Sequence, residues 1–174
     1  MSYQKKLAHS YKNIFLDRDG IVNEMIMRGN IVSSPRSANE FVFRQDFLDF
    51  MEGLGDRNNL FIVTNQPDIK RGLLKEQDLA DIHKIINRCC SIKKILFCPH
   101  DDDERCLCRK PLPGMIDRAI KEYSLTRNEC FLVGDSHKDM LAARAAKIEA
   151  ALLRTNYNKP LNGFLSIDSL VDLL

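Results

Sequence analysis

Short runs of apolar residues alternate along the chain with segments whose apolar residues recur at helical spacing. Strands buried on both faces are predicted at 13–17, 60–65, 94–98, 130–135 and 150–153. Amphipathic helices are predicted at 47–54, 79–89, 115–123, 141–145 and, as a short last element, 167–174. Strands that are apolar on both faces and separated by helices form parallel sheets covered on both sides. The pattern therefore predicts an α/β fold, a Rossmann-like doubly wound parallel sheet.

One long segment, 20–40, has no regular pattern and contains Gly29 and Pro35 among several Ser and Asn residues. Irregular segments of this length in compact domains are usually functional or mobile. Phe41 and Phe43 follow it at alternate positions. We expect these two rings to anchor the segment to the core.

The chain has 174 residues, which predicts a single domain spanning 1–174. Its apolar share of 44% and charged share of 29% exclude an intrinsically disordered chain. The formal net charge of +2 gives no reason to expect nucleic acid or an anionic membrane as a partner. Residues 1–12 are polar, lack an apolar secretory segment and are expected to be a flexible tail. We expect a cytoplasmic monomer.

Polar side chains follow the predicted strands where each one ends. In chain order the strand ends lead into Asp17-Arg18-Asp19-Gly20, Thr64-Asn65, Arg109-Lys110-Pro111 and Gly134-Asp135, with Asp139 close behind. Ligands of such sheets bind beyond the carboxyl ends of the strands. By itself an Asp-x-Asp-Gly sequence is an ordinary turn. The ordered set at successive strand ends predicts a functional crevice.

The residue types in this crevice favour phosphoryl transfer. Three carboxylates that share one crevice repel one another and need a cation. Hard oxygen ligands with open positions suit Mg²⁺, which completes its shell with water and a substrate phosphate. Lys110 and the Thr64 hydroxyl would then hold phosphate oxygens, while Mg²⁺ offsets the charge that repels a carboxylate nucleophile.

A second cluster precedes the lysine. Cys98, His100, Cys106 and Cys108 form a C-x-H-x5-C-x-C sequence within the loop 98–108. Four such ligands in eleven residues suit a closed tetrahedral Zn²⁺ site with no position left for water, which makes the metal structural. The alternative is a solvated acidic loop with incidental thiols. We expect zinc to fix this loop so that Arg109 and Lys110 point into the crevice. Cys89, Cys90 and Cys130 are expected to be core or near-core thiols.

The sequences FLDRDGIVNE, TNQ, CRKP and GDSHKD resemble the four motifs of the haloacid dehalogenase (HAD) superfamily of aspartate-nucleophile phosphatases, in order over residues 13 to about 155. By this resemblance Asp17 is the nucleophile, Asp19 the general acid and base, and Thr64 and Lys110 the phosphate-holding pair. The resemblance also implies that Asp17, the Asp19 backbone carbonyl and Asp135 hold Mg²⁺. Asp139 is expected to orient Lys110 or a metal-bound water.

The intervals between the motifs leave no room for a cap domain. Only 46 residues separate Asp17 from Thr64, and 44 separate Asn65 from Lys110. We expect a capless, open site whose specificity lies in short loops.

The sequence of the predicted zinc loop indicates one branch of the superfamily. CPH followed by CxCRKPxPGM is similar to the branch of histidinol phosphatases and D-glycero-D-manno-heptose 1,7-bisphosphate 7-phosphatases. The Pro-Gly-Met continuation and the chain length favour the heptose members, whose product serves lipopolysaccharide-precursor pathways; histidinol phosphate is the alternative. The branch implies that Asn65 and Arg109 bind substrate. Arg28 and Arg36 are candidates for a second phosphate, since Arg matches phosphate oxygens, or are plain solvated charges.

Some positions depart from the branch, among them Ser136, where a lysine is usual, and the segment Asp68–Gly72. These departures lie where the rest of the substrate would rest, so they bear on substrate identity. Two other hypotheses stay open. A non-catalytic phosphate-binding module would have lost at least one of the chemical residues. A polynucleotide 3′-phosphatase would need a basic groove with stacking aromatics, and this chain has no Trp.

Overall fold

The computed structural model describes residues 7–159 and 161–174. Its centre is a six-stranded parallel sheet in the order β5-β4-β1-β6-β7-β8. The strands are β1 Asn13–Leu16, β4 Asn59–Asn65, β5 Ile92–Cys98, β6 Cys130–Gly134, β7 Glu149–Leu153 and β8 Leu165–Ile167. The α-helices are α1 Leu7–Ser10, α2 Gln45–Leu54, α3 Glu76–Cys89, α4 Gly114–Glu122 and α5 His137–Ala146. Four of the five predicted helices and all five predicted strands are present, and the doubly wound sheet is confirmed.

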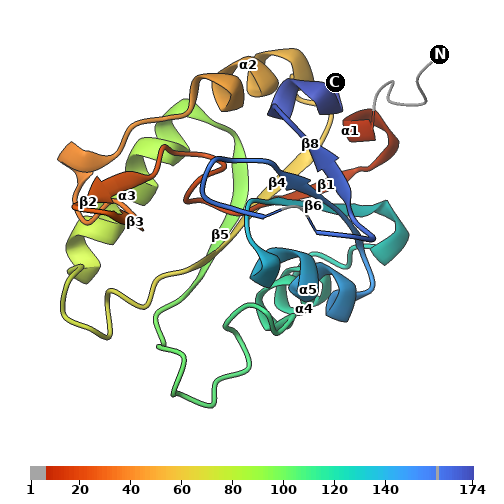
Figure 1. The fold of residues 1–174 in the computed structure, drawn as a ribbon. Helices are drawn as coiled ribbons and strands as arrows, with labels where there is room; N and C mark the ends of the chain where they lie inside the picture. The colour runs from red at the N-terminus through yellow and green to blue at the C-terminus, as the bar shows by residue number, and fades with distance from the viewer. Residues whose placement is uncertain (1–6, 160) are drawn as a thin grey trace.

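The two faces of the sheet carry separate cores. Successive strand residues point to opposite faces, so Ile14 and Leu16 join one core while Phe15 joins the other. Helices α2 and α3 pack on the first face, and α4 and α5 on the second. In Figure 1 these helix pairs lie on opposite sides of the sheet. Because both faces are covered, the central strands β1, β4 and β6 are buried along nearly their whole length, which is why their apolar runs are visible in the sequence.

The predicted helix at 167–174 is wrong. Ile167 ends β8, which pairs in parallel with β7. Only a 3-10 turn, η3 Leu170–Leu173, follows. A capping box of Ser169 and Asp172 starts that turn after the strand has ended. The apolar residues of this segment therefore divide between a sixth strand and a turn.

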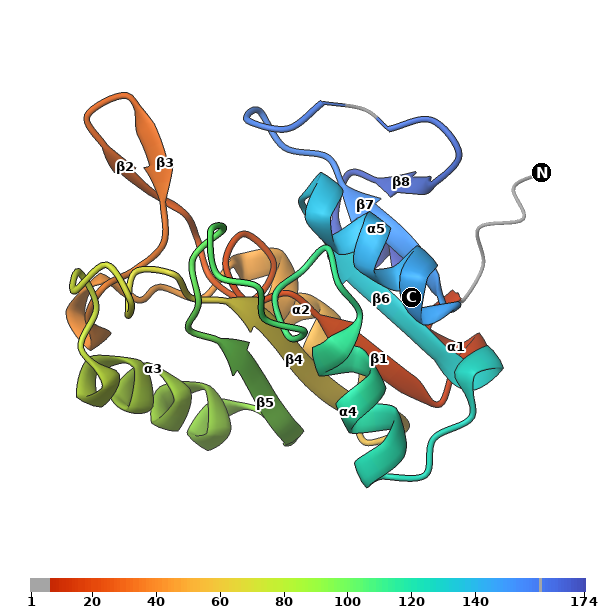
Figure 2. The same ribbon diagram turned by 90° about the horizontal axis from the view of Figure 1, so that it is seen from below.

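The long segment 20–40 is not irregular throughout. It forms an antiparallel hairpin of β2 Ile26–Arg28 and β3 Ile31–Ser33, followed by the 3-10 turn η1 Ala38–Glu40. Gly29 has φ +62° in the two-residue turn, a conformation that glycine adopts without strain. Figure 2 shows the hairpin projecting from the body of the fold. Phe41 is buried and contacts Phe43 edge-on, and Phe43 stacks on Phe47 of α2, as expected for an anchor.

The structure corrects part of the prediction for the N-terminal tail. Of the predicted tail 1–12, residues 1–6 lie outside the described residues, whereas Leu7–Ser10 form α1 and Ala8 is buried in the core.

Cys90 and Cys130 are buried, but Cys89 is exposed. The buried residues of α3 are Leu79, Ile82 and Ile86. Cys89 is the exposed last residue of the helix, and the buried Cys90 follows it in an extended conformation. Among the described residues, no helix is both long and apolar enough to cross a membrane.

Candidate active site

The carboxyl ends of β1, β4 and β6 and the loop after β5 meet at a pocket of about 350 Å³. Seven of the predicted site residues line it: Asp17, Asp19, Thr64, Asn65, Arg109, Lys110 and Asp135. Ser136 and Lys138 at the start of α5 also line the pocket. A larger pocket of about 550 Å³ lies at the other end of the strands, near Leu60 and Ser91, and contains none of these residues.

A buried lysine connects two carboxylates at the bottom of the pocket. The Lys110 ammonium lies 2.9 Å from Asp17 Oδ1 and 2.5 Å from Asp139 Oδ1, and it donates to the carbonyl of Val63 at 2.8 Å. Burial and the charge of Asp139 raise the pKa of Asp17 well above its usual value. Burial favours the neutral amine of Lys110, but the charges of Asp139 and Asp17 outweigh it and raise the pKa of Lys110. The protonation of these three side chains is therefore coupled.

Asp139 has both oxygens occupied. Besides the contact with Lys110, its Oδ2 accepts hydrogen bonds from the backbone N–H of Ser136 at 3.0 Å and from the Ser136 hydroxyl at 2.5 Å. This is the capping box that begins α5. Asp139 is fully buried and contacts Lys110, the residue that the sequence predicted it to orient as one of two alternative roles.

Asp135 is the third carboxylate of the group. Burial and the charge of Asp139 raise the pKa of Asp135 to about 7. The Tyr157 hydroxyl donates to Asp135 Oδ2 at 2.6 Å. Gly20, at φ +84°, passes so close that a Cβ there would lie 2.0 Å from the same oxygen. No sequence signal marked Tyr157, because the loop after β7 contains no motif and reaches Asp135 only in the folded chain.

These carboxylates fit a divalent cation. One oxygen from each of Asp17, Asp135 and Asp139 lies within 4.8 Å of the other two. Both oxygens of Asp139 are already in contact with Lys110 and Ser136. The pair that could hold the ion is therefore Asp17 and Asp135. Burial and the charge of Asp139 raise the pKa of both carboxyl groups, and bound Mg²⁺ would favour their ionised forms.

Two neighbours fix the orientation of Asp19. Arg18 is fully buried and forms a two-pronged contact, with Nε 2.9 Å from Asp19 Oδ1 and Nη2 2.9 Å from Oδ2. The Gln66 amide donates to Asp19 Oδ2 at 2.7 Å and to Thr64 Oγ1 at 2.8 Å. Gln66 thus couples the ends of β1 and β4. Sequence reasoning assigned no role to either residue, although both stand inside the motifs.

The Asn65 side chain hydrogen-bonds the backbone of Lys110. Its Oδ1 accepts from the N–H of Lys110 at 3.0 Å, and its Nδ2 donates to the carbonyl of Lys110 at 2.9 Å. This pair of bonds fixes the lysine at the carboxyl end of β4. Asn65 also lines the pocket, and its amide oxygen and nitrogen each make a hydrogen bond to the backbone of Lys110.

Arg28 and Arg36 do not line this pocket. Arg28 forms a two-pronged contact with Glu40, at 3.0 Å and 2.5 Å. Arg36 Nε donates to Asp68 Oδ2 at 2.7 Å. Each arginine already has a carboxylate partner, so the structure does not bring either of them together with Asp17.

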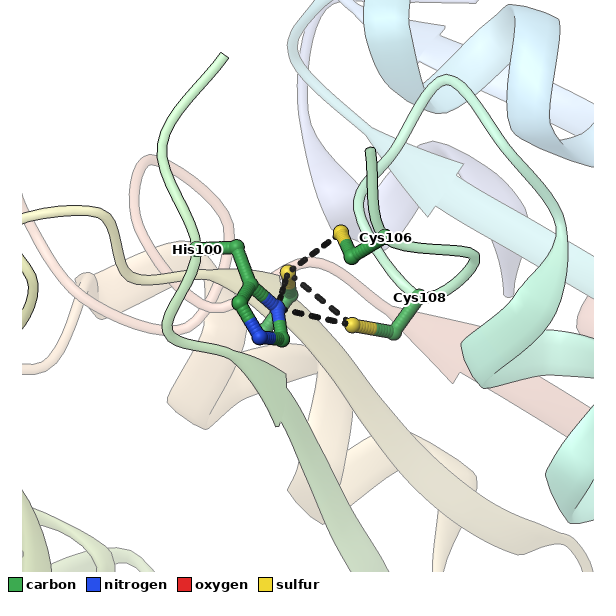
Figure 3. Close-up of side chains that lie close together, drawn as sticks. His100, Cys106 and Cys108 are labelled. Carbon is green, nitrogen blue, oxygen red and sulfur yellow. Dashed lines mark hydrogen bonds between the residues drawn. The ribbon is translucent and has the colours of Figure 1, made fainter. Parts of the chain in front are cut away.

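The Cys/His cluster forms a compact group of four ligands beside the pocket. Cys98 Sγ lies 3.1 Å from Cys108 Sγ, 3.6 Å from Cys106 Sγ and 3.4 Å from His100 Nδ1. In Figure 3 His100, Cys106 and Cys108 point toward one another. Tetrahedral zinc, with ligands at about 2.0–2.3 Å, separates neighbouring ligand atoms by about 3.5 Å. Burial, with the Cys108 thiol, raises the pKa of Cys98, and a metal that takes thiolates offsets that cost. The cluster fits zinc.

The Cys/His loop 98–108 leads directly into Arg109. Arg109 is largely buried, and its Nη1 donates to the carbonyl of His100 at 3.0 Å. Its Nε lies 2.8 Å from Asp102 Oδ1. Arg109 and Lys110 both reach the pocket, in the arrangement that the sequence predicted for the residues after the last ligand.

Comparison with known proteins decides the family. The HAD-hydrolase-like family model matches residues 107–163. The chain is 33% identical over 153 residues to the D-glycero-beta-D-manno-heptose-1,7-bisphosphate 7-phosphatase of Helicobacter pylori strain J99, with 83% of each chain covered. It is 34% identical over 154 residues to the protein of that name from Neisseria meningitidis serogroup A, covering 85% of this chain and 80% of the relative. The chain belongs to the HAD superfamily of phosphatases.

A solved structure agrees with this HAD assignment. The D,D-heptose 1,7-bisphosphate phosphatase of B. bronchiseptica, complexed with magnesium and phosphate, has a TM-score of 0.80 to this chain at 29% identity, covering 93% of this chain and 95% of that one. A magnesium-bound relative of this similarity supports Mg²⁺ at the carboxylates of this HAD phosphatase. The chain is therefore a phosphoric monoester hydrolase, as its motifs predicted.

Proposed function

We propose that the chain is a Mg²⁺-dependent phosphatase that removes the 7-phosphate of D-glycero-D-manno-heptose 1,7-bisphosphate. The names of its relatives at 33–34% identity supply the substrate. The observation that carries the chemistry is the position of Asp17, 2.9 Å from the buried Lys110 ammonium in a pocket that Thr64 and Asp19 also line. Histidinol phosphate, the alternative from the sequence, is the competing substrate in the test below.

Asp17 is the nucleophile of this proposal. Its carboxylate oxygen attacks the phosphorus and the bond to the sugar oxygen breaks, which leaves an aspartyl-phosphate. Lys110 and the Thr64 hydroxyl hold the phosphoryl oxygens as charge moves onto them. Asp17, the Asp19 carbonyl and Asp135 are the residues that would hold Mg²⁺, and the bound ion would reduce the repulsion between phosphate and carboxylate.

Asp19 moves the protons. Asp19 enters the first step in its protonated form and gives that proton to the departing sugar oxygen, which becomes a hydroxyl group. In the second step it takes a proton from the water that attacks the phosphorus, so Asp17 returns as a carboxylate and phosphate leaves. Arg18 and Gln66 fix the direction of the Asp19 carboxylate, which removes rotational freedom that both proton transfers would otherwise have to overcome.

The remaining residues hold the substrate or the site. Arg109 contacts the substrate, and Asn65 keeps Lys110 in place from the opposite side. Zinc on Cys98, His100, Cys106 and Cys108 is structural, because all four positions are filled by protein ligands. The single open domain and the monomeric state stay predictions of this proposal.

Phosphate release tests the proposal. The purified chain is assayed with both anomers of the heptose 1,7-bisphosphate and with histidinol phosphate, each with and without Mg²⁺. We expect Mg²⁺-dependent turnover of one heptose anomer. Asp17→Asn should abolish turnover, because the amide is a poor nucleophile, while circular dichroism stays unchanged. Asp56→Asn, at the opposite end of the strands, is the matched control and should retain activity.

Each other outcome removes a defined part of the proposal. Turnover of histidinol phosphate alone would keep the mechanism and replace the substrate. Residual turnover by Asp17→Asn with the same substrate would refute the nucleophile. No turnover of any compound by folded, zinc-loaded protein would refute the proposed substrate and favour the binding-module hypothesis.

A further inference from the structure

The carboxyl group of Asp135 has one occupied and one unoccupied oxygen. Its Oδ2 accepts a hydrogen bond from the Tyr157 hydroxyl at 2.6 Å. Gly20 passes so close that a Cβ there would lie 2.0 Å from the same Oδ2 and 2.6 Å from the Tyr157 hydroxyl oxygen. A cation could reach Oδ2 only by displacing the hydroxyl group beside the Gly20 backbone. Oδ1 has no hydrogen-bond partner among the described residues, so it is the oxygen left for a cation.

The turn after β7 holds Tyr157 in this position. Asn158 Nδ2 donates to the carbonyls of Asp135 at 2.8 Å and of Leu153 at 2.7 Å, which joins the ends of β6 and β7. Asn158 Oδ1 accepts from the Thr155 N–H at 3.1 Å, and the Asn158 N–H donates to Thr155 Oγ1 at 3.2 Å. Both polar atoms of the Asn158 side chain are thereby used. Tyr157 is therefore anchored to the backbone of the same residue whose carboxylate it contacts.

Asp17, the other carboxylate that could hold the ion, also has one occupied oxygen. Its Oδ1 lies 2.9 Å from the Lys110 ammonium and accepts from the N–H of Arg18 at 2.7 Å. Within the part of the chain that the structure describes, no group hydrogen-bonds to its Oδ2. The two carboxylates of the proposed Mg²⁺ site therefore offer one oxygen each.

One oxygen from each carboxylate suits a small cation better than a large one. Mg²⁺ requires near-octahedral geometry at about 2.0–2.1 Å and keeps several waters beside one or two carboxylates. Ca²⁺ binds oxygens at about 2.3–2.6 Å, takes more of them, and often uses both oxygens of a carboxylate. We propose that Tyr157 and Asn158 are positioning residues that limit Asp135 to one ligand oxygen and thereby make the site select Mg²⁺ over Ca²⁺. The inference rests on the proposed function, because it needs Asp17 and Asp135 to bind Mg²⁺.

Cation binding in the absence of substrate tests the selectivity. Calorimetry measures the affinities of the zinc-loaded wild-type chain and of Tyr157→Phe for MgCl₂ and for CaCl₂. Phe keeps the ring and frees Asp135 Oδ2, so the ratio of Mg²⁺ affinity to Ca²⁺ affinity should fall about tenfold, the scale of one bond to a charged oxygen. Protons compete with both cations alike, so this ratio reports the ligand set and not the protonation of Asp135. Tyr123→Phe is the matched control, because its hydroxyl contacts the Lys93 carbonyl at the opposite end of the strands, and its ratio should stay within about twofold of the wild-type ratio.

A second variant tests whether Asn158 acts through Tyr157. Asn158→Ala removes the bonds that anchor the turn but keeps the hydroxyl, and the ratio of affinities should fall as in Tyr157→Phe. Because both changes release the same oxygen of Asp135, the double variant should show no larger fall than the stronger single variant. An unchanged ratio in Asn158→Ala, or effects that multiply in the double variant, would overturn the role of Asn158.

The proposed function and this inference can fail separately. If the wild-type chain binds no Mg²⁺, the Mg²⁺ dependence of the proposed function fails and the inference fails with it. If the wild-type chain binds Mg²⁺ and Tyr157→Phe keeps the wild-type ratio of affinities, only the inference is overturned. If that ratio falls as expected but the heptose 1,7-bisphosphate is not hydrolysed, the selectivity is supported and only the proposed substrate fails.

Discussion

Replacing Asp139 by Asn separates two tasks that one buried carboxylate performs. Oδ1 pairs with Lys110 and Oδ2 caps α5 through Ser136. The amide of Asn has one acceptor oxygen, and its NH₂ group must face either an ammonium or an N–H donor. One of the two contacts is therefore lost whichever way the side chain turns, and the negative charge is lost in both cases.

The magnitude follows from burial. Loss of a capping side chain costs about 1 kcal/mol. Removing one partner of a buried ion pair costs about 3–5 kcal/mol, and here the remaining contact of Lys110 with Asp17 offsets part of that. We expect a loss of about 3 kcal/mol in the free energy of unfolding, since the cap and the pair share one side chain. For a chain of this length that lowers Tm by about 6–12 °C.

The structure supplies its own control. Asp172 occupies the same position in the second capping box, at Ser169, but has no lysine partner among the described residues. Asp172→Asn should cost about 1 kcal/mol, the cap alone. Both variants are unfolded with urea in Mg²⁺-free buffer with zinc retained. In a double-mutant cycle, Lys110→Met and Asp139→Asn together should cost about 2 kcal/mol less than the sum of the single changes. Equal losses in the two Asn variants, or an additive cycle, would refute the buried-pair reasoning.

Three further predictions concern the metals. Cys106→Ser should lower bound zinc well below one per chain by elemental analysis and reduce Tm, whereas Cys89→Ser, outside the cluster, should change neither. The folded-state pKa of Asp135, about 7, lies above its unfolded value, so the folded chain binds more protons between these values. The stability that the raised pKa of Asp135 contributes is present below about pH 4 and is lost as pH rises through 7. Mg²⁺ should therefore raise Tm more at pH 8 than at pH 5. An equal rise in Tm at both pH values would contradict the raised pKa of Asp135. Tyr157→Phe removes the hydroxyl that lowers the Asp135 pKa and should weaken Mg²⁺ affinity about threefold to tenfold by calorimetry. Unchanged affinity would remove Tyr157 from the site.

Local sequence determined the parts of the site that depend on neighbours in the chain. The four Cys/His residues that could hold zinc lie within eleven residues, so their spacing alone fixes which groups can meet. The strand-end motifs are equally local, because a parallel sheet brings all carboxyl ends to one edge whatever the loops do. That regularity is why the sequence alone predicted that Asp17, Thr64, Lys110 and Asp135 lie together in one pocket.

Elements at the edge of the fold were harder to predict. The apolar residues of 165–174 are too few to show a period, so a strand and a 3-10 turn resemble one short helix. The β2–β3 hairpin is invisible for a related reason. Met27 and Ile31 are exposed, so the pattern that burial imposes on a strand is missing there.

Only the tertiary structure decided how the charges pair. The arginine at 28 meets Glu40, and the one at 36 meets Asp68 across 32 positions, so neither faces the phosphate pocket. Arg109 and Lys138 meet at Asp102 instead, although no motif contains all three. The energy of a charge pair depends on the distance between the two groups in the folded chain and on their burial. A one-dimensional pattern carries neither quantity, so the sequence determines which chemistry is present and the fold determines which charges serve it.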